Sequence, residues 1–127
     1  MKRYIAIVLI FLLVASISTT EFIYVHKTIN SVEEQTIKIK TMLKNDEHTT
    51  ALKMHATNLQ DFWEKHENFL CMFVYHQELK EIGDSISILS AQIENEKYDD
   101  AKIDVHQLIY LIGTFRDLYE FNIVNIF

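Results

Sequence analysis

The chain contains no proline and only two glycines among its 127 residues. β-Sandwiches and barrels need many tight turns, and those turns draw heavily on both residue types. Phosphate-binding loops need closely spaced glycines. The composition therefore argues against β-rich folds, Rossmann-type nucleotide binding and P-loop chemistry. Apolar residues make up 49% of the chain, which is typical of a folded protein and too high for a disordered one.

Apolar residues recur at spacings of three and four in four successive segments, which places them on one face of a helix in each segment. We therefore expect an all-α fold. The four predicted faces are Val25, Ile29, Val32, Ile39 and Leu43; Leu52, Leu59, Phe62, Phe69 and Phe73; Leu79, Ile82, Ile86, Leu89 and Ile93; and Val105, Leu108, Ile112, Phe115 and Tyr119, with Thr36, His55 and His66 filling gaps.

Short polar segments separate these helices. Asn45–Glu47 and Asn95–Lys97 contain Asn, which tolerates the left-handed conformation at helix ends, and acidic residues. The phase of the apolar face slips within 73–76, where either a break or one continuous long helix fits the pattern. We expect two antiparallel helix hairpins, arranged as a four-helix up-down bundle or in a TPR-like manner.

A weak internal repeat appears at an offset of 50 residues, and both duplication and chance similarity explain it. The matching positions are Leu43–Asp46 with Ile93–Glu96, Ala51 with Ala101, and Leu59 with Ile109. Gly83 and Gly113 both lie inside predicted helices beside the apolar face. Close approach of a neighbouring helix is the expected reason, and a hinge is the alternative.

Residues 4–20 carry no charge and follow Lys2 and Arg3. A helix of about 20 apolar residues spans a bilayer core, and preceding basic residues favour a cytoplasmic N-terminus. We expect a membrane anchor at 1–24 and an extracytoplasmic helical domain at 25–127. Alternatives are a cleaved signal peptide, with Ser16–Ser18 as its small-residue exit, and a buried core helix.

All eighteen Asp and Glu but only ten of the twelve Lys and Arg lie beyond residue 20, which gives that part a net charge of −8. This excess argues against nucleic acid and anionic lipid as partners.

No catalytic signature such as HExxH or Gly-x-Ser-x-Gly is present. Cys71 lies five residues from both His66 and His76, a spacing that turns side chains about 140° apart on a continuous helix. We therefore expect Cys71 to be a small buried hydrophobe and the protein not to be an enzyme. Among the six histidines only His48 and His55 recur on one face, so we expect neither a metal nor a cofactor.

Five residues are candidates for structural or interaction roles. Trp63 is expected in the core, with its indole N–H bonded at the bundle edge. His76 is expected at a helix join, where it can bond a free backbone group. Asn125, Ile126 and Phe127 end an apolar segment that fits neither helix nor strand. We expect an irregular or extended tail there, with Ile126 and Phe127 buried.

One family shares these features: a basic start, one apolar span, Trp63, Phe73–Leu79, the stripe Ile82/Ile86/Leu89 and the ending Asn125–Phe127. Together they resemble the bacterial family called domain of unknown function 4363. The resemblance implies a small, single-span helical protein from spore-forming Gram-positive bacteria of the clostridial type, with no assigned activity. Gly83 departs from the pattern, because a stronger helix former is expected there.

We expect a membrane-anchored protein-interaction or scaffold module with a protein partner outside the cytoplasm. The alternative is a ligand- or metal-sensing bundle that acts through a partner protein. The first function predicts an apolar patch on the outside of the bundle, and the second a pocket with converging polar groups. The sequence leaves the oligomeric state open.

Overall fold

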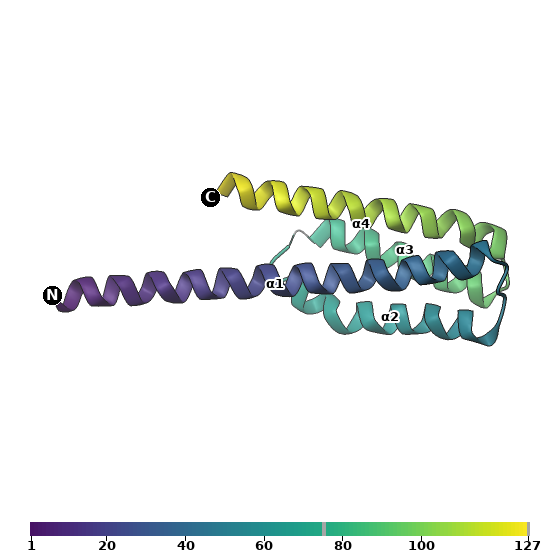
Figure 1. The fold of residues 1–127 in the computed structure, drawn as a ribbon, viewed down its shortest axis with the longest axis horizontal. Coiled ribbons are helices and arrows are strands. Elements are labelled where there is room, and N and C mark those ends of the chain that lie inside the picture. The colour runs from purple at the N-terminus through teal and green to yellow at the C-terminus, as the bar shows by residue number, and fades with distance from the viewer. Residues whose placement is uncertain (75, 127) are drawn as a thin grey trace.

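The computed structural model describes residues 1–74 and 76–126, with the backbone alone described at 122, 123, 125 and 126. It contains α1 (Lys2–Lys44), α2 (Thr50–Leu70), α3 (His76–Glu94) and α4 (Tyr98–Ile126), as Figure 1 shows. No strand occurs among these residues. The all-α prediction and the prediction of a long, apolar first helix are both confirmed.

The four helices lie side by side over the C-terminal half of α1, and the rest of α1 projects from this bundle (Figure 1). α1 packs against α2 and α4, and α3 packs against the same two helices. Each helix therefore has two neighbours, and the four apolar faces meet in one core.

The buried faces of three helices agree with the apolar spacing. Every predicted core position of α1, α3 and α4 is buried, and Thr36 fills its gap as expected. On α2 the prediction was partly wrong. The buried residues there are Leu52, Ala56, Leu59, Trp63 and Leu70. Phe62 and Phe69 have the same seven-residue spacing as Trp63 and Leu70, so periodicity could not choose between these adjacent faces.

The helix ends near Asn45 and Asn95 share one backbone motif. The N–H of Glu47 donates to the carbonyl of Met42 at 2.9 Å, and the N–H of Lys97 donates to that of Gln92 at 2.8 Å. The residue before each donor is left-handed, with φ of 54° at Asp46 and 59° at Glu96. These are Schellman endings, and they confirm the predicted ends of α1 and α3.

The pattern of buried positions repeats between the two halves of the chain, but with two different offsets. Between α1 and α3 the offset of 50 holds, and it becomes 49 between α2 and α4 because the first connection is longer. Ala51 is exposed whereas Ala101 is buried, so this predicted pairing was wrong. Between α2 and α4 the equivalent buried residues are Leu52 with Ala101, Ala56 with Val105, and Leu59 with Leu108.

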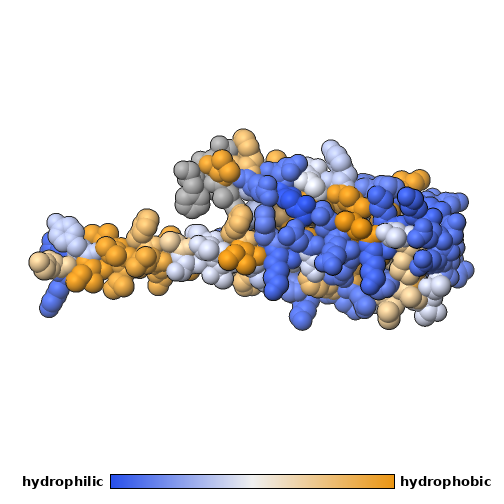
Figure 2. All heavy atoms as spheres, viewed as in Figure 1, coloured by the Kyte–Doolittle hydropathy of each residue, from blue (hydrophilic) through white to orange (hydrophobic). Residues whose placement is uncertain are grey.

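α1 runs without a break from its exposed part into the bundle. Its first buried residue is Val25, and the residues before it form an apolar rod, visible at the left of Figure 2. Among the described residues one helix, α1, is long and apolar enough to cross a membrane, a test that signal sequences also pass.

The join between α2 and α3 is a break, so the alternative of one continuous helix was wrong. α2 ends at Leu70, and the N–H groups of Phe73 and Val74 both bond the carbonyl of that residue in a tight turn. Since no proline or glycine lies there, the turn follows from packing rather than from local propensity.

One further expectation needed correction. α4 stays helical to Ile126, so the irregular or extended tail was wrong; Phe121 and Val124 fit a helical spacing once the chain is already helical. The predicted burial of Ile126 and Phe127 falls outside the described side chains.

The glycines differ from each other. A Cβ on Gly83 would lie 2.7 Å from Trp63 Nε1, which confirms close helix approach there. No atom lies within 4 Å of a Cβ built on Gly113, so close approach does not explain that residue.

Candidate functional site

Aromatic side chains gather where α1 leaves the bundle. We call this region the aromatic end. It is built from α1, from the last turns of α2 with the following turn, and from the last turns of α4. Its members are Phe22, Tyr24, Phe62, His66, Phe69, Phe73, Phe115 and Tyr119.

Tyr24 and His66 join α1 to α2 at the aromatic end. Their Oη and Nδ1 atoms are 2.7 Å apart, and the Tyr24 ring meets the edge of Phe69 at a centroid distance of 4.6 Å. Burial lowers the pKa of His66, and the charge of Lys65 lowers it further. The donor in this bond depends on the imidazole tautomer: the tyrosine hydroxyl donates to a bare Nδ1 and accepts from a protonated one.

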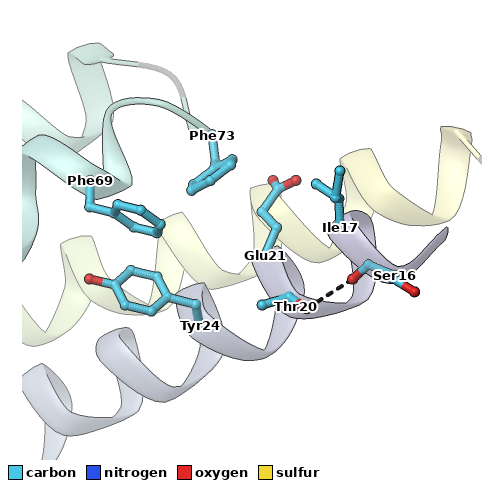
Figure 3. A pocket seen from close by; sticks show the side chains of 7 residues that line it. All are labelled: Ser16, Ile17, Thr20, Glu21, Tyr24, Phe69 and Phe73. Atoms are coloured by element: carbon cyan, nitrogen blue, oxygen red, sulfur yellow. Dashed lines mark hydrogen bonds between the residues drawn. The ribbon is translucent and has the colours of Figure 1, made fainter. Parts of the chain in front are cut away.

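A groove of about 290 Å³ opens beside these rings and beside the exposed part of α1 (Figure 3). The α1 wall consists of Ser16, Ile17, Thr20, Glu21 and Tyr24, and the other wall of Phe69 and Phe73. The Thr20 hydroxyl donates to the Ser16 carbonyl at 2.9 Å, so it is already satisfied. The groove offers rings, methyl groups and one carboxylate, which suits an apolar chain better than a polar ligand.

Tyr119 ties α4 to α1 on the other side of the aromatic end. Its hydroxyl donates to Glu21 at 3.5 Å, and its ring lies near Phe22. Burial, followed by the charge and hydrogen bond of Glu21, raises the pKa of Tyr119 to about 12. One turn further along α1, His26 Nε2 lies 3.3 Å from a carboxylate oxygen of Glu120.

Trp63 lies in the core, as predicted, with 2% of its surface exposed. The predicted hydrogen bond of its indole was wrong, because no acceptor among the described residues is in reach of Nε1. The indole N–H faces Gly83 rather than the bundle edge.

His76 begins α3 and contacts a side chain rather than the predicted backbone group. Its Nδ1 lies 3.4 Å from Cys71 Sγ. The expectation that these residues point apart assumed a continuous helix, and the break after Leu70 brings them together. Burial raises the pKa of the Cys71 thiol, and Glu67 adds to this effect. Both causes favour the protonated thiol, which is a poor nucleophile.

The structure brings only some of the predicted residues to one place. His76 follows the turn at the aromatic end, whereas Trp63 packs into the core against Gly83. The backbone of Asn125 and Ile126 forms the last turn of α4, and Phe127 lies outside the described residues. Sequence reasoning missed Glu21, Tyr24 and Tyr119 as partners, because they meet only in the folded chain.

The solvent side of α4 carries a second apolar stripe. Ile103, Tyr110 and Phe121 are separated by 7 and 11 residues, which places them on one side of the helix. They are 68%, 72% and 64% exposed. We call them the outer stripe. α4 thus presents aligned apolar side chains on its solvent side, with polar residues such as Thr114 and Asp117 between them, in addition to its apolar core side.

A second groove, of about 210 Å³, lies between α3 and α4 and is acidic. Glu81, Asp84 and Asp104 line it. Burial raises the pKa of Asp104, and repulsion from Asp100 adds to the shift. Within residues 1–74 and 76–126, no group of three or more His, Cys, Asp or Glu side chains is placed to hold a metal ion.

Comparison with known proteins adds one finding. No curated protein and no solved structure matches the chain. One family, described as "Domain of unknown function (DUF4363)", matches residues 19–126. This match covers most of the chain, including all of α2, α3 and α4. The chain belongs to the DUF4363 family.

Proposed function

We propose that the protein is a membrane-anchored interaction module whose helical domain lies outside the cytoplasm and binds a partner protein through the outer stripe of α4. The observation that carries this proposal is the exposure of Ile103 and Tyr110 on a helix whose opposite face already fills the core. Large apolar side chains that are exposed and aligned on one side of a helix point to a second partner.

The other helices of the bundle lack such a stripe. The large apolar residues exposed on their solvent sides, away from the aromatic end, are isolated: Ile37, Met54 and Ile88. Scattered single hydrophobes are normal on protein surfaces, whereas an aligned set points to a binding surface. The outer stripe is therefore the surface that we assign to the partner.

The length and composition of α1 support the anchor at 1–24. Lys2 and Arg3 precede the charge-free residues 4–20, which favours a cytoplasmic N-terminus by the positive-inside rule. The domain at 25–127 then lies outside the cytoplasm, and its acidity favours solubility there.

The packing favours an up-down bundle of two antiparallel hairpins over a TPR-like stack. α1 contacts α4, and the chain therefore closes into a ring of four helices. In a stack of helix pairs the first and last helices are kept apart by those between them. A closed bundle leaves outward faces, rather than a concave groove, for the partner.

The alternative function is ligand or metal sensing through a partner protein. The acidic groove beside Asp104 is the place for it, since it combines three carboxylates with Ser85 and Gln107. Its carboxylates do not converge on one point as metal ligands do. We therefore favour the interaction module, and we propose no enzymatic activity.

The test is site-specific photocrosslinking of the full chain in native membranes. A photoreactive phenylalanine at Tyr110 should give one defined protein adduct. The same label at Asn58, an exposed polar residue of α2, should give none. The partner protein should no longer copurify with the double variant Ile103→Lys/Tyr110→Lys. Equal adducts at both positions, or no adduct at Tyr110, would contradict the proposal.

A further inference from the structure

We propose that the aromatic end of the bundle and the last turns of α4 are immersed in the interfacial layer of the bilayer that α1 spans. The partner of this surface is a zwitterionic lipid bilayer. The inference rests on the proposed membrane anchor. It shares one residue, Phe121, with the outer stripe, and it leaves Ile103 and Tyr110 to the protein partner.

The first argument is length. The charge-free residues 4–20, at 1.5 Å per residue, span about 26 Å, whereas a bilayer hydrocarbon core measures about 30 Å. Lys2 and Arg3 hold the other end of the helix at the opposite surface. The charge-free segment is therefore no longer than the hydrocarbon core, and the interfacial layer begins in the turn after Thr20, at the level of Phe22 and Tyr24.

The second argument is rigidity. α1 is one unbroken helix from Lys2 to Lys44, so the bundle cannot swing away from the span at a flexible linker. The Oη atom of Tyr24 lies 2.7 Å from Nδ1 of His66, and the ring centroid of Phe22 lies 6.3 Å from that of Tyr119. When the Phe22–Tyr24 level of α1 enters the interface, these residues of α2 and α4 enter it too.

The third argument is exposure. Three apolar residues at this end lack protein cover: Met72 in the turn after α2 is 72% exposed, and Phe121 and Val124 on α4 are 64% and 74% exposed. α4 continues about 10 Å past Tyr119, which bonds Glu21. Its last turns therefore reach the level of the charge-free part of α1 along the bundle axis, as Figure 1 shows, and Figure 2 shows hydrophobic atoms at this end.

The polar groups at this end fit a headgroup layer rather than the hydrocarbon core. Glu21 accepts from Tyr119, and His26 lies 3.3 Å from Glu120, so the ionisable groups at this level already have partners. Aromatic rings concentrate in this layer of membrane proteins. Because the chain beyond residue 20 has a net charge of −8, the docking is apolar and needs no anionic lipid.

The experiment uses spin labels on the full chain in phosphatidylcholine nanodiscs, with Cys71→Ala to remove the native thiol. Single labels are placed by Ile10→Cys in the span, Met72→Cys and Val124→Cys at the proposed interface, and Ile103→Cys on the distant part of α4. Collisions with oxygen, which enriches in lipid, and with a polar nickel chelate, which stays in water, report the position of each label.

We expect Ile10 deep in lipid, Ile103 in water, and Met72 and Val124 at shallow depth, with several-fold fewer nickel collisions than Ile103. If Ile10 is in water, the anchor fails and the inference with it. If Ile10 is in lipid while Met72 and Val124 match Ile103, only the docking is overturned. Labels at 72 and 124 shielded from both reagents would show that protein covers this surface, which also overturns it. Circular dichroism of each variant verifies the fold.

Discussion

At the scale of single residues, the contact between Gly83 and Trp63 leaves no room for a larger side chain at position 83. Gly83→Ala would raise helix propensity by about 1 kcal/mol, but the new Cβ would lie 2.7 Å from a buried indole nitrogen. Overpacking of this kind costs about 1–3 kcal/mol. We expect the variant to melt a few degrees lower than the parent, measured by circular dichroism of the full chain in detergent.

Gly113→Ala is the matched control, because no atom lies within 4 Å of its added Cβ. Because Ala has a higher helix propensity than Gly, this variant should melt at a slightly higher temperature than the parent. If both variants were stabilised equally, the Gly83–Trp63 contact would not limit the packing of α2 on α3.

His66 makes the stability of the aromatic end sensitive to pH. Its pKa is lowered in the folded state by burial, so the unfolded chain takes up this proton first as the pH falls below about 6.5. Stability therefore decreases with falling pH in that window. We expect the melting temperature to drop between pH about 8 and about 5.5, and to drop less in His66→Phe. If the melting temperature fell equally in the parent and in His66→Phe, a group other than His66 would cause the pH dependence.

At the scale of helices and their ends, the two Schellman turns place acidic residues where glycine is preferred. Glu96 has a φ of 59°, which costs a residue with a Cβ roughly 1 kcal/mol. Its ion pair with Lys53, at 3.5 Å, is exposed and contributes little.

Glu96→Gly should therefore stabilise the protein by about 1 kcal/mol, read as a higher urea midpoint. Glu94→Gly, two residues earlier and still within α3, should instead destabilise it by about 0.5–1 kcal/mol. A loss of stability in Glu96→Gly would mean that the Lys53 pair outweighs the backbone term.

The sequence predicted the helices well because their core faces repeat at a helical period on α1, α3 and α4. It could not rank the two adjacent faces of α2, since Phe62/Phe69 and Trp63/Leu70 have equal spacing. The break between α2 and α3 was one of two readings that the sequence left open, because the apolar face slips there but no turn-forming residue marks the position. Packing between helices decided both points.

The aromatic end was less predictable, because its contacts join residues far apart in the chain. Tyr24 meets His66 across 42 positions, and Glu21 meets Tyr119 across 98. No local period records such pairs. The contact between Cys71 and His76 likewise depends on the break between α2 and α3, which the sequence left open.

At the scale of the whole molecule, one unbroken helix, α1, joins the proposed anchor to the domain. The bundle axis follows the axis of the span (Figure 1), so the outer stripe of α4 runs along the membrane normal in the proposed arrangement. A partner that presents an apolar helix parallel to that normal would match it in direction. The position of the stripe above the membrane is then fixed by the helix rather than by a linker.

The last prediction concerns retention of this helix. Residues 16–22, where a signal peptidase would cut, are helical, and Thr19 and Thr20 each bond a carbonyl four residues earlier. Cutting there would require unwinding the helix and would remove part of the α1 wall of the apolar groove. We therefore expect protein extracted from membranes to begin at or next to Met1, as mapped by mass spectrometry.

A matched variant separates the role of the helix from that of the sequence motif. Ser16→Ala/Ser18→Ala/Thr20→Pro supplies small residues in A-x-A spacing and breaks the helix beside them, so this chain should be shortened. If the parent chain itself began between Ser16 and Phe22, the domain would be a secreted bundle. The aromatic end would then face water, and its exposed residues Met72, Phe121 and Val124 would need a protein to cover them.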